Sequence, residues 1–188
     1  MTGRYEVRLA GTGGQGLIFA GVVLAEAAGV YGGLHVAQSQ VYGIVSRGGA
    51  SRSEVVVSDE EIDFPEIERQ DMLVALSQHA FNAFGRDMKP GGVALVDPDL
   101  VKVPADYPYK AYAIPVTRIA AERVGTELVA NVVVLGVLSV LTDVFKFEDL
   151  KKVLEKRGSS GSSQRNLKAL EEGRVAATSL KSPGGNKA

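Results

Sequence analysis

Short apolar stretches and longer amphipathic stretches alternate along the chain. Residues 5–10 alternate between apolar and polar positions, which is typical of a half-buried strand. Residues 72–76 form a continuous apolar run, which is typical of a strand buried on both faces. Strands are predicted at residues 5–10, 35–39, 53–57, 72–76, 93–96 and 111–114.

Helical spacing of apolar positions predicts the remaining elements. Helices are predicted from Leu17 to Ala28 with Gly29 as the stop, from Ser77 to about Asp87, and at residues 116–124, 129–141, 148–157 and 164–177. Residues 59–69 hold six acids and Pro65, which favours a solvated connection or a poor helix. The sequence GSSGSS at residues 158–163 is expected to be a loop.

The order of these elements predicts the fold class. Strands come early and alternate with helices, whereas the last part of the chain is helical. This order is typical of a three-layer, Rossmann-like α/β domain with a mixed, mostly parallel sheet. The C-terminal helical segment is expected to pack on that domain or on a partner. With 188 residues, the chain is expected to form one domain over residues 1–180, followed by a disordered tail at residues 181–188.

Composition and charge exclude several classes of protein. Hydrophobic residues make up 45% and charged residues 23% of the chain, which excludes wholesale disorder. The 21 Lys and Arg against 22 Asp and Glu leave no basic excess, so neither nucleic acid nor a membrane surface is expected as a partner. Without a membrane-length apolar run or a signal peptide, the chain is expected to be cytoplasmic.

The chain also lacks the side chains of several chemistries. It has no cysteine, which excludes disulfides, thiolate catalysis and an iron–sulfur cluster held by this chain. Its two histidines, His35 and His79, are far apart in the sequence and predict no metal site. No local sequence supports a catalytic triad. The isolated chain is therefore expected to carry out no redox or hydrolytic reaction.

The first candidate site is a glycine turn between the first strand and the first helix. It runs Gly11-Thr12-Gly13-Gly14-Gln15-Gly16 and fits the pattern G-x-G-x-x-G. Glycines at a helix N-terminus leave room for a phosphate against free N–H groups. Gly11, Gly13, Gly14, Gln15 and Gly16 are therefore candidate cofactor-binding residues. The alternative is a tight turn that only packs the helix on the strand.

A nicotinamide dinucleotide is disfavoured at this turn. Such cofactors need an acidic residue at the end of the second strand to bind the ribose hydroxyls. Here that position holds Gln38-Ser39-Gln40, without an acid or an arginine. The turn therefore predicts an anion or the phosphate of another cofactor.

The second candidate site is the segment between the second and third strands. Tyr42, Arg47, Gly48 and Gly49 combine a guanidinium with exposed backbone N–H groups, which suits an anion or a carboxylate. We expect this segment and the glycine turn to converge on one crevice at the carboxyl ends of the first strands. The alternative is a surface loop with solvated arginines.

The apolar helix at residues 129–141 carries two unusual residues. Asn131 is expected to be a packing residue rather than a ligand, and Gly136 allows another helix to approach closely. We expect this helix and those after it to form a large apolar contact with another chain. Without that partner, the chain is expected to pair with itself.

Several of these segments together resemble the gamma subunit of 2-oxoacid:ferredoxin oxidoreductases. The resemblance spans about residues 4–178. It rests on residues 6–16, 25–28, 42–43 and 47–55, and on later landmarks at Asn131, Leu135-Gly136 and residues 166–173. Ser51-Arg52-Ser53-Glu54 resembles the 2-oxoglutarate or branched-chain type. The beta subunit of indolepyruvate oxidoreductase is the close alternative.

The resemblance implies a gamma-type catalytic domain and a part in an enzyme. Such complexes oxidatively decarboxylate a 2-oxoacid with coenzyme A, giving an acyl-CoA, carbon dioxide and reduced ferredoxin. It implies alpha, beta and possibly delta (ferredoxin-like) subunits and ferredoxin as partners. Thiamine diphosphate would lie between the alpha and beta subunits and the iron–sulfur cluster on another chain. An independent nicotinamide-dependent enzyme and a nucleotide-sensing module remain the alternatives from other classes.

Overall fold

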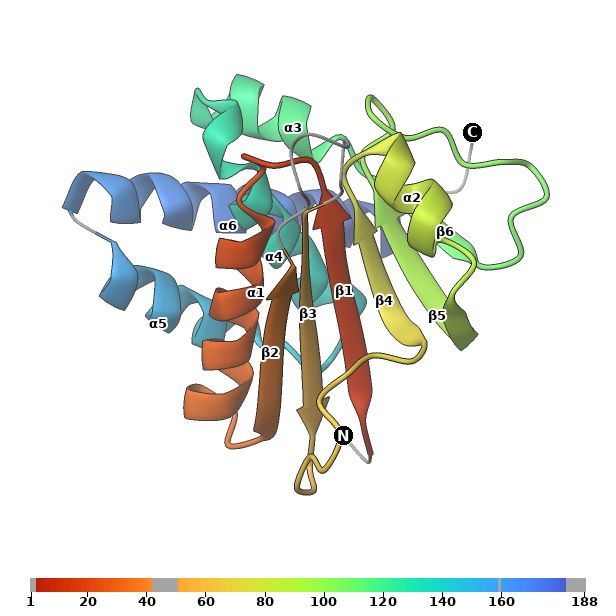
Figure 1. Ribbon diagram of the computed structural model, residues 1–188. Coiled ribbons are helices and arrows are strands. Elements are labelled where there is room, and N and C mark those ends of the chain that lie inside the picture. The colour runs from red at the N-terminus through yellow and green to blue at the C-terminus, as the bar shows by residue number, and fades with distance from the viewer. Residues whose placement is uncertain (1–2, 42–50, 159, 182–188) are drawn as a thin grey trace.

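A computed structural model describes residues 3–41, 51–158 and 160–181. Its six strands form one sheet in the order β2-β3-β1-β4-β5-β6 (Figure 1). The strands are β1 (Tyr5–Gly11), β2 (His35–Val41), β3 (Ser51–Ser58), β4 (Gln70–Ala75), β5 (Met88–Val96) and β6 (Lys110–Ala113). Strand β3 pairs antiparallel with β1 and β2, whereas β1, β4, β5 and β6 pair in parallel. The expected mixed, mostly parallel sheet is confirmed.

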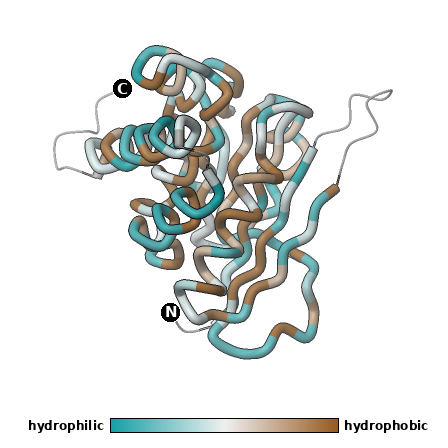
Figure 2. The backbone as a smooth tube through the Cα atoms, turned by 90° about the vertical axis from the view of Figure 1, so that its left-hand side faces the viewer, coloured by the Kyte–Doolittle hydropathy of each residue, from teal (hydrophilic) through white to brown (hydrophobic). Residues whose placement is uncertain are grey.

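Helices cover the two faces of the sheet unequally. One face carries α1 (Leu17–Glu26), α4 (Ala130–Leu141), α5 (Phe147–Arg157) and α6 (Ser160–Lys181), and its core is the larger one. The other face carries the short helix α2 (Gln78–Phe84) and a smaller core. Figure 2 shows the large helical layer on one side of the sheet. No helix among the described residues is both long and apolar enough to cross a membrane.

Short helical elements complete the large layer. They are α3 (Val116–Ile119), the π-helices η1 (Ala27–Tyr31) and η3 (Ala120–Val124), and the 3-10 helix η4 (Glu127–Val129). The last of these leads directly into α4, and η1 continues α1 towards β2.

Two glycines bring α4 and α6 into direct backbone contact. A Cβ added at Gly136 would overlap the carbonyl oxygen of Leu170, and one added at Gly173 would overlap that of Val133. Glycine is needed at both positions because only its bare backbone permits this approach. The predicted packing role of Gly136 is confirmed.

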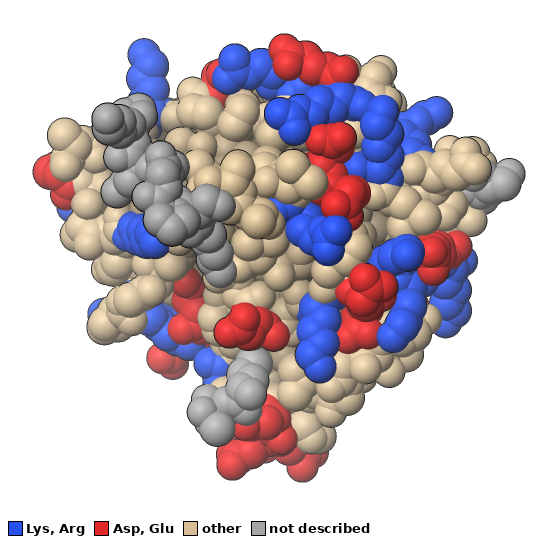
Figure 3. All heavy atoms as spheres, turned by 180° about the vertical axis from the view of Figure 1, so that it is seen from behind, with Lys and Arg blue, Asp and Glu red and all other residues tan. Residues whose placement is uncertain are grey.

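The expectation that α4 contacts another chain is wrong. Residues 130–138 are all buried, because α4 is enclosed by the sheet and by other helices of the same chain. Seen from behind, the molecule shows Lys and Arg mixed with Asp and Glu on its surface (Figure 3). Hydropathy alone did not distinguish a helix buried within its own chain from one that waits for a partner.

The face of the sheet that carries α2 contains a buried ionic network. Arg8 of β1 lies directly opposite Glu54 of β3, and the Arg8 Nε donates to the Glu54 Oε1 at 2.8 Å. Arg8 also donates to the Gln70 Oε1 at 2.6 Å, and its guanidinium lies 4.7 Å from the centre of the Phe84 ring. Arg52 adds a second cation beside Glu54, at 3.3 Å.

The sequence predicts that the first helix stops at Gly29. Instead, α1 continues past Glu26 as the wider π-helix η1. The chain turns only at Gly32 and Gly33, where the Gly32 N–H bonds to the Ala27 carbonyl at 2.9 Å. Gly33 has a φ of 69°, a left-handed conformation that suits glycine and directs the chain into β2.

The predicted turn before residue 93 is instead part of β5. That strand begins at Met88, and its register against β4 shifts between Gln70 and Met72. Pro90 and the two glycines after it therefore form an irregular strand, and α2 ends at Phe84 rather than near Asp87. The helix start at Ser77 is confirmed, because the Ser77 Oγ accepts from the Ala80 N–H at 3.2 Å.

Helix α6 is longer than predicted at both ends. It begins at Ser160, inside the expected GSSGSS loop, and extends to Lys181, the first residue of the expected tail. Serines suit the first turn of a helix because their hydroxyls can accept from its unpaired N–H groups. Residues 182–188 lie outside the described residues. Residues 59–69 join β3 to β4 without a helix, so the first of the two predicted alternatives, a connection, holds.

The buried network predicts a large cost for removing its carboxylate. Glu54→Ala should lower the free energy of unfolding by about 3–5 kcal/mol, because Arg8 would lose its buried ion-pair partner and keep only the half-exposed Asp87 at 3.2 Å. The matched control is Asp106→Ala, which breaks an exposed ion pair with Arg86 and should cost less than about 1 kcal/mol. Urea unfolding measures both values, and equal losses would contradict a structural role for the network.

Candidate functional site

The sheet has a topological switch point between β1 and β4. Strand β1 continues into α1, which packs in the large helical layer, and β4 continues into α2 on the opposite face. The two neighbouring strands are parallel, so their carboxyl ends lie at the same edge. Ligands of open α/β sheets bind at such an edge, in the crevice where the connections diverge. The glycine turn lies at this point.

The side chain of Gln15 ties the glycine turn to the end of β4. Its Oε1 accepts from the Thr12 N–H at 2.7 Å, and its Nε2 donates to the Leu76 carbonyl at 2.8 Å. A Cβ at Gly11 would overlap the Gln15 Oε1, so glycine at this position makes room for the amide. Gln15 therefore holds the turn in place at the switch point.

Gly13 and Gly14 form the open part of the turn. A Cβ added at either residue would meet no atom of the described part of the chain within 4 Å. Gly14 has a φ of 90°, which other residues rarely adopt, whereas the φ of Gly13 lies outside the left-handed region. The first N–H groups of an α-helix have no partner within the helix, and α1 begins directly after the turn. Space and donors for an anion therefore occur together.

Asn131 of α4 contacts the glycine turn from the large helical layer. Its Nδ2 donates to the Gly16 carbonyl at 3.0 Å, and a Cβ at Gly16 would overlap that amide. Asn131 is only 5% exposed, and its Oδ1 has no hydrogen-bond partner. The packing role predicted for Asn131 is confirmed, and its contact is the glycine turn.

A hollow of about 250 Å³ lies beside the turn. It is lined by Gly14, Gln15, Leu76, Leu100, Thr117, Glu127, Leu128 and Ala130. Leu128 is 81% exposed and Leu100 is 39% exposed, so the hollow has an apolar rim. Sequence reasoning missed Leu100, Thr117, Glu127 and Leu128, because no motif marks them and only the strand order brings their loops to this edge.

The second predicted site falls outside the described residues. Tyr42, Arg47, Gly48 and Gly49 all lie in residues 42–50. The residues on either side of this segment are described, and both lie at the edge of the glycine turn. Ser51 pairs with Gly11, and Val41 pairs with Arg52. Convergence of Arg47 with the turn stays a prediction.

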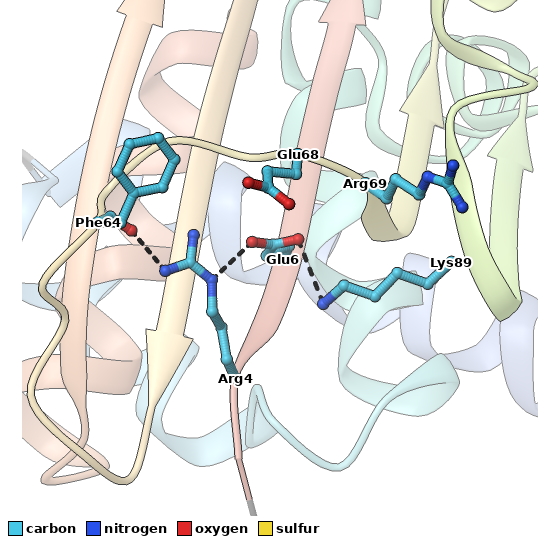
Figure 4. A pocket seen from close by; sticks show the side chains of 6 residues that line it. All are labelled: Arg4, Glu6, Phe64, Glu68, Arg69 and Lys89. Atoms are coloured by element: carbon cyan, nitrogen blue, oxygen red, sulfur yellow. Dashed lines mark hydrogen bonds and ion pairs between the residues drawn. The ribbon is translucent and has the colours of Figure 1, made fainter.

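A second hollow, of about 380 Å³, lies near the opposite end of the sheet (Figure 4). Two of the three cations that line it, Arg4 and Lys89, are already engaged. Arg4 donates to the carbonyls of Phe64 and Glu66 and to the Glu6 side chain, while the Lys89 Nζ lies 2.7 Å from Asp71 and 3.2 Å from Glu6. These bonds hold the acidic connection at residues 59–69 against the sheet. We therefore favour the switch point as the functional site.

Two other polar residues, Asp97 and His79, differ in their surroundings. Asp97 follows β5 and is fully buried; its carboxylate accepts from the N–H groups of Asp99 at 3.0 Å and Thr117 at 2.9 Å. His79 is exposed on α2. Within the described part of the chain, no group of three or more His, Asp or Glu side chains is arranged to hold a metal ion.

Comparison with known proteins identifies similar chains. The family model described as pyruvate ferredoxin/flavodoxin oxidoreductase matches residues 6–176. The 2-oxoglutarate synthase subunit KorC of Methanocaldococcus jannaschii is 46% identical over 180 residues, which cover 94% of this chain and 96% of that protein.

Two solved structures share the fold. The gamma subunit of a keto/oxoacid ferredoxin oxidoreductase from Geobacter sulfurreducens is 44% identical with a TM-score of 0.86, covering 95% of this chain and 98% of that one. The 2-oxoglutarate:ferredoxin oxidoreductase of Magnetococcus marinus, described with 2-oxoglutarate, coenzyme A and succinyl-CoA bound, is 28% identical with a TM-score of 0.83. That match covers 96% of this chain and 32% of the longer chain.

The geometry of the turn predicts opposite outcomes for two glycines. Gly11→Ala should destabilise the fold by about 1–3 kcal/mol, because the new methyl group displaces the Gln15 amide. Gly13→Ala should change the free energy of unfolding by less than about 1 kcal/mol, since its methyl group meets open space. Thermal and urea unfolding compare the two variants. A larger loss for Gly13→Ala would show that the turn is held differently.

Proposed function

The chain belongs to the pyruvate ferredoxin/flavodoxin oxidoreductase family, as the gamma subunit of a 2-oxoacid:ferredoxin oxidoreductase, and we propose that its 2-oxoacid is 2-oxoglutarate. The support is the naming of similar proteins: the archaeal relative at 46% identity and the Magnetococcus enzyme are both named for 2-oxoglutarate. The proposed reaction is the oxidative decarboxylation of 2-oxoglutarate with coenzyme A, which gives succinyl-CoA, carbon dioxide and reduced ferredoxin.

Within that enzyme, the glycine turn is proposed to bind a phosphate of coenzyme A. The observation that carries this proposal is the open space above Gly13 and Gly14 at the start of α1. Coenzyme A carries a pyrophosphate and a third phosphate, and a helix N-terminus favours such anions through its free N–H groups and its dipole.

The rest of the edge fits the other parts of that substrate. The apolar rim formed by Leu100 and Leu128 suits the uncharged arm of coenzyme A. Arg47, in the segment that begins and ends at this edge, is proposed to supply a cation for another phosphate, with Tyr42, Gly48 and Gly49 around it. Gln15 acts as a positioning residue, because its amide is engaged by the turn and by Leu76.

The redox cofactors are proposed to belong to other subunits. The chain has no cysteine, so its side chains do not fit an iron–sulfur cluster. We assign thiamine diphosphate to the alpha and beta subunits, and the iron–sulfur cluster to another chain such as the ferredoxin-like delta subunit. Ferredoxin would be the electron acceptor and the cytoplasm the site of the reaction.

The proposed function predicts where activity resides and which 2-oxoacid is preferred. The purified chain alone should not reduce ferredoxin with any 2-oxoacid, because it offers no group that can accept electrons. The complete complex should give a kcat/KM for 2-oxoglutarate at least about tenfold above that for pyruvate, a difference of roughly 1.4 kcal/mol.

The measurement is 2-oxoacid-dependent reduction of ferredoxin by the chain and by the complex, in parallel. Turnover by the single chain would contradict its role as a dependent subunit. A preference of the complex for pyruvate or for a branched 2-oxoacid would contradict only the choice of substrate.

A further inference from the structure

Strand β2 forms one edge of the sheet and lacks the usual protection of an edge. No strand among the described residues pairs with its outer side. Natural edge strands are generally short, bulged, or marked by charges or proline, which prevents pairing with another chain. The seven residues His35–Val41 include no Lys, Arg, Asp, Glu or Pro, and they pair with β3 in an unbroken register. Among the described residues nothing pairs with this edge, so a further strand can pair there.

The opposite edge of the sheet shows the contrast. Strand β6 has only four residues and begins with Lys110, whose Nζ lies 4.5 Å from the centre of the Tyr112 ring. A short strand with a lysine is a protected edge. The same sheet therefore has one protected edge and one unprotected edge, and only β2 offers a long uncharged backbone.

We propose that β2 pairs with β2 of a second copy of this chain, so that two sheets join into one. A two-fold axis perpendicular to the sheet pairs a strand with its own copy in antiparallel orientation, and the two surfaces are then identical. With Gln38 at the centre of the strand, Gln38 lies opposite its copy and His35 lies opposite Val41. The strand contains no Lys, Arg, Asp or Glu, so no such side chain repels its own copy across this axis.

The surface around β2 adds to the contact. A stable interface buries about 800 Å² on each partner, more than one strand edge supplies. The π-helix η1 leads through a short turn into β2 (Figure 1), and Val30 within it is 68% exposed. Val41, at the far end of the strand, is 43% exposed. Antiparallel pairing brings the η1 end of one copy beside the Val41 end of the other.

Thiol cross-linking tests the geometry directly, because the chain has no cysteine of its own. The probe is a short bis-maleimide added to single-cysteine variants of the full chain. Gln38→Cys places two thiols opposite each other, with Cβ atoms about 5 Å apart, and Ser39→Cys places them diagonally, about 7–8 Å apart. Both variants should give a covalent dimer. Ala113→Cys, at an exposed position of β6, is the matched control and should stay monomeric on a denaturing gel.

Charge variants test the energetics in parallel. Ser39→Lys should weaken self-association at least about tenfold in sedimentation equilibrium, because two lysines then lie diagonally across the axis on the same face of the joined sheet. Val30→Asp should weaken it as well, whereas Val175→Asp, at a 49% exposed valine of α6, should leave it unchanged. Circular dichroism of each variant establishes that it is folded.

Three results would overturn the proposal. The first is a wild-type chain that remains monomeric at high concentration. The second is a dimer whose affinity is the same with Ser39→Lys as without it. The third is a yield of covalent dimer from the Ala113→Cys variant that equals the yield from Gln38→Cys or Ser39→Cys. None of these outcomes bears on the catalytic proposal, because they are read from the chain alone and without substrate.

Discussion

The contact between α4 and α6 at Gly136 and Gly173 sets the position of the glycine turn. Because neither glycine has a side chain, the two helix backbones touch and α4 is enclosed within the chain. Enclosure fixes the N-terminal end of α4, from which Asn131 reaches the Gly16 carbonyl. Gly16 in turn begins α1, so the close packing of two late helices supports a turn more than one hundred residues earlier in the chain.

The turn is therefore held from two sides and open on a third. Gln15 ties it to the end of β4, and Asn131 ties it to the helical layer. Above Gly13 and Gly14, no atom of the described residues lies within reach of an added Cβ. In the proposed function, a preformed turn of this kind costs little ordering when a phosphate binds, because the donors are already in place. This suits a subunit that helps to bind a substrate and contributes no reacting group.

Much of this could be predicted from the sequence, and the exceptions have physical reasons. The strand–glycine turn–helix unit follows from local periodicity and the φ freedom of glycine. The sequence therefore predicts β1, the turn and the start of α1 correctly. The antiparallel orientation of β3 and the strand order depend on long-range pairing, which no local pattern encodes. Leu100 and Leu128 reach the site only through that order, so they carried no signal.

Other errors came from features whose meaning depends on their neighbours. The apolar pattern of α4 was predicted to mark a contact with another chain, and α6 of the same chain covers it instead. Pro90 and Gly91 were predicted to form a turn, and pairing with β4 holds them within β5 as an irregularity. Residues 160–163 of the low-complexity segment were predicted to be loop, and they form the first turn of α6.

The Michaelis constant for coenzyme A in the assembled enzyme is the most direct test of the account. Gly13→Val adds a side chain above the turn, where an added Cβ meets no described atom within 4 Å, and Gly161→Val makes the same change at a remote position of α6 with the same clearance. The account predicts that Gly13→Val raises the KM for coenzyme A about tenfold or more while the KM for 2-oxoglutarate and the kcat are unchanged. Gly161→Val should change none of these values. An unaltered KM for coenzyme A in a folded, assembled Gly13→Val enzyme would contradict a phosphate site at the glycine turn.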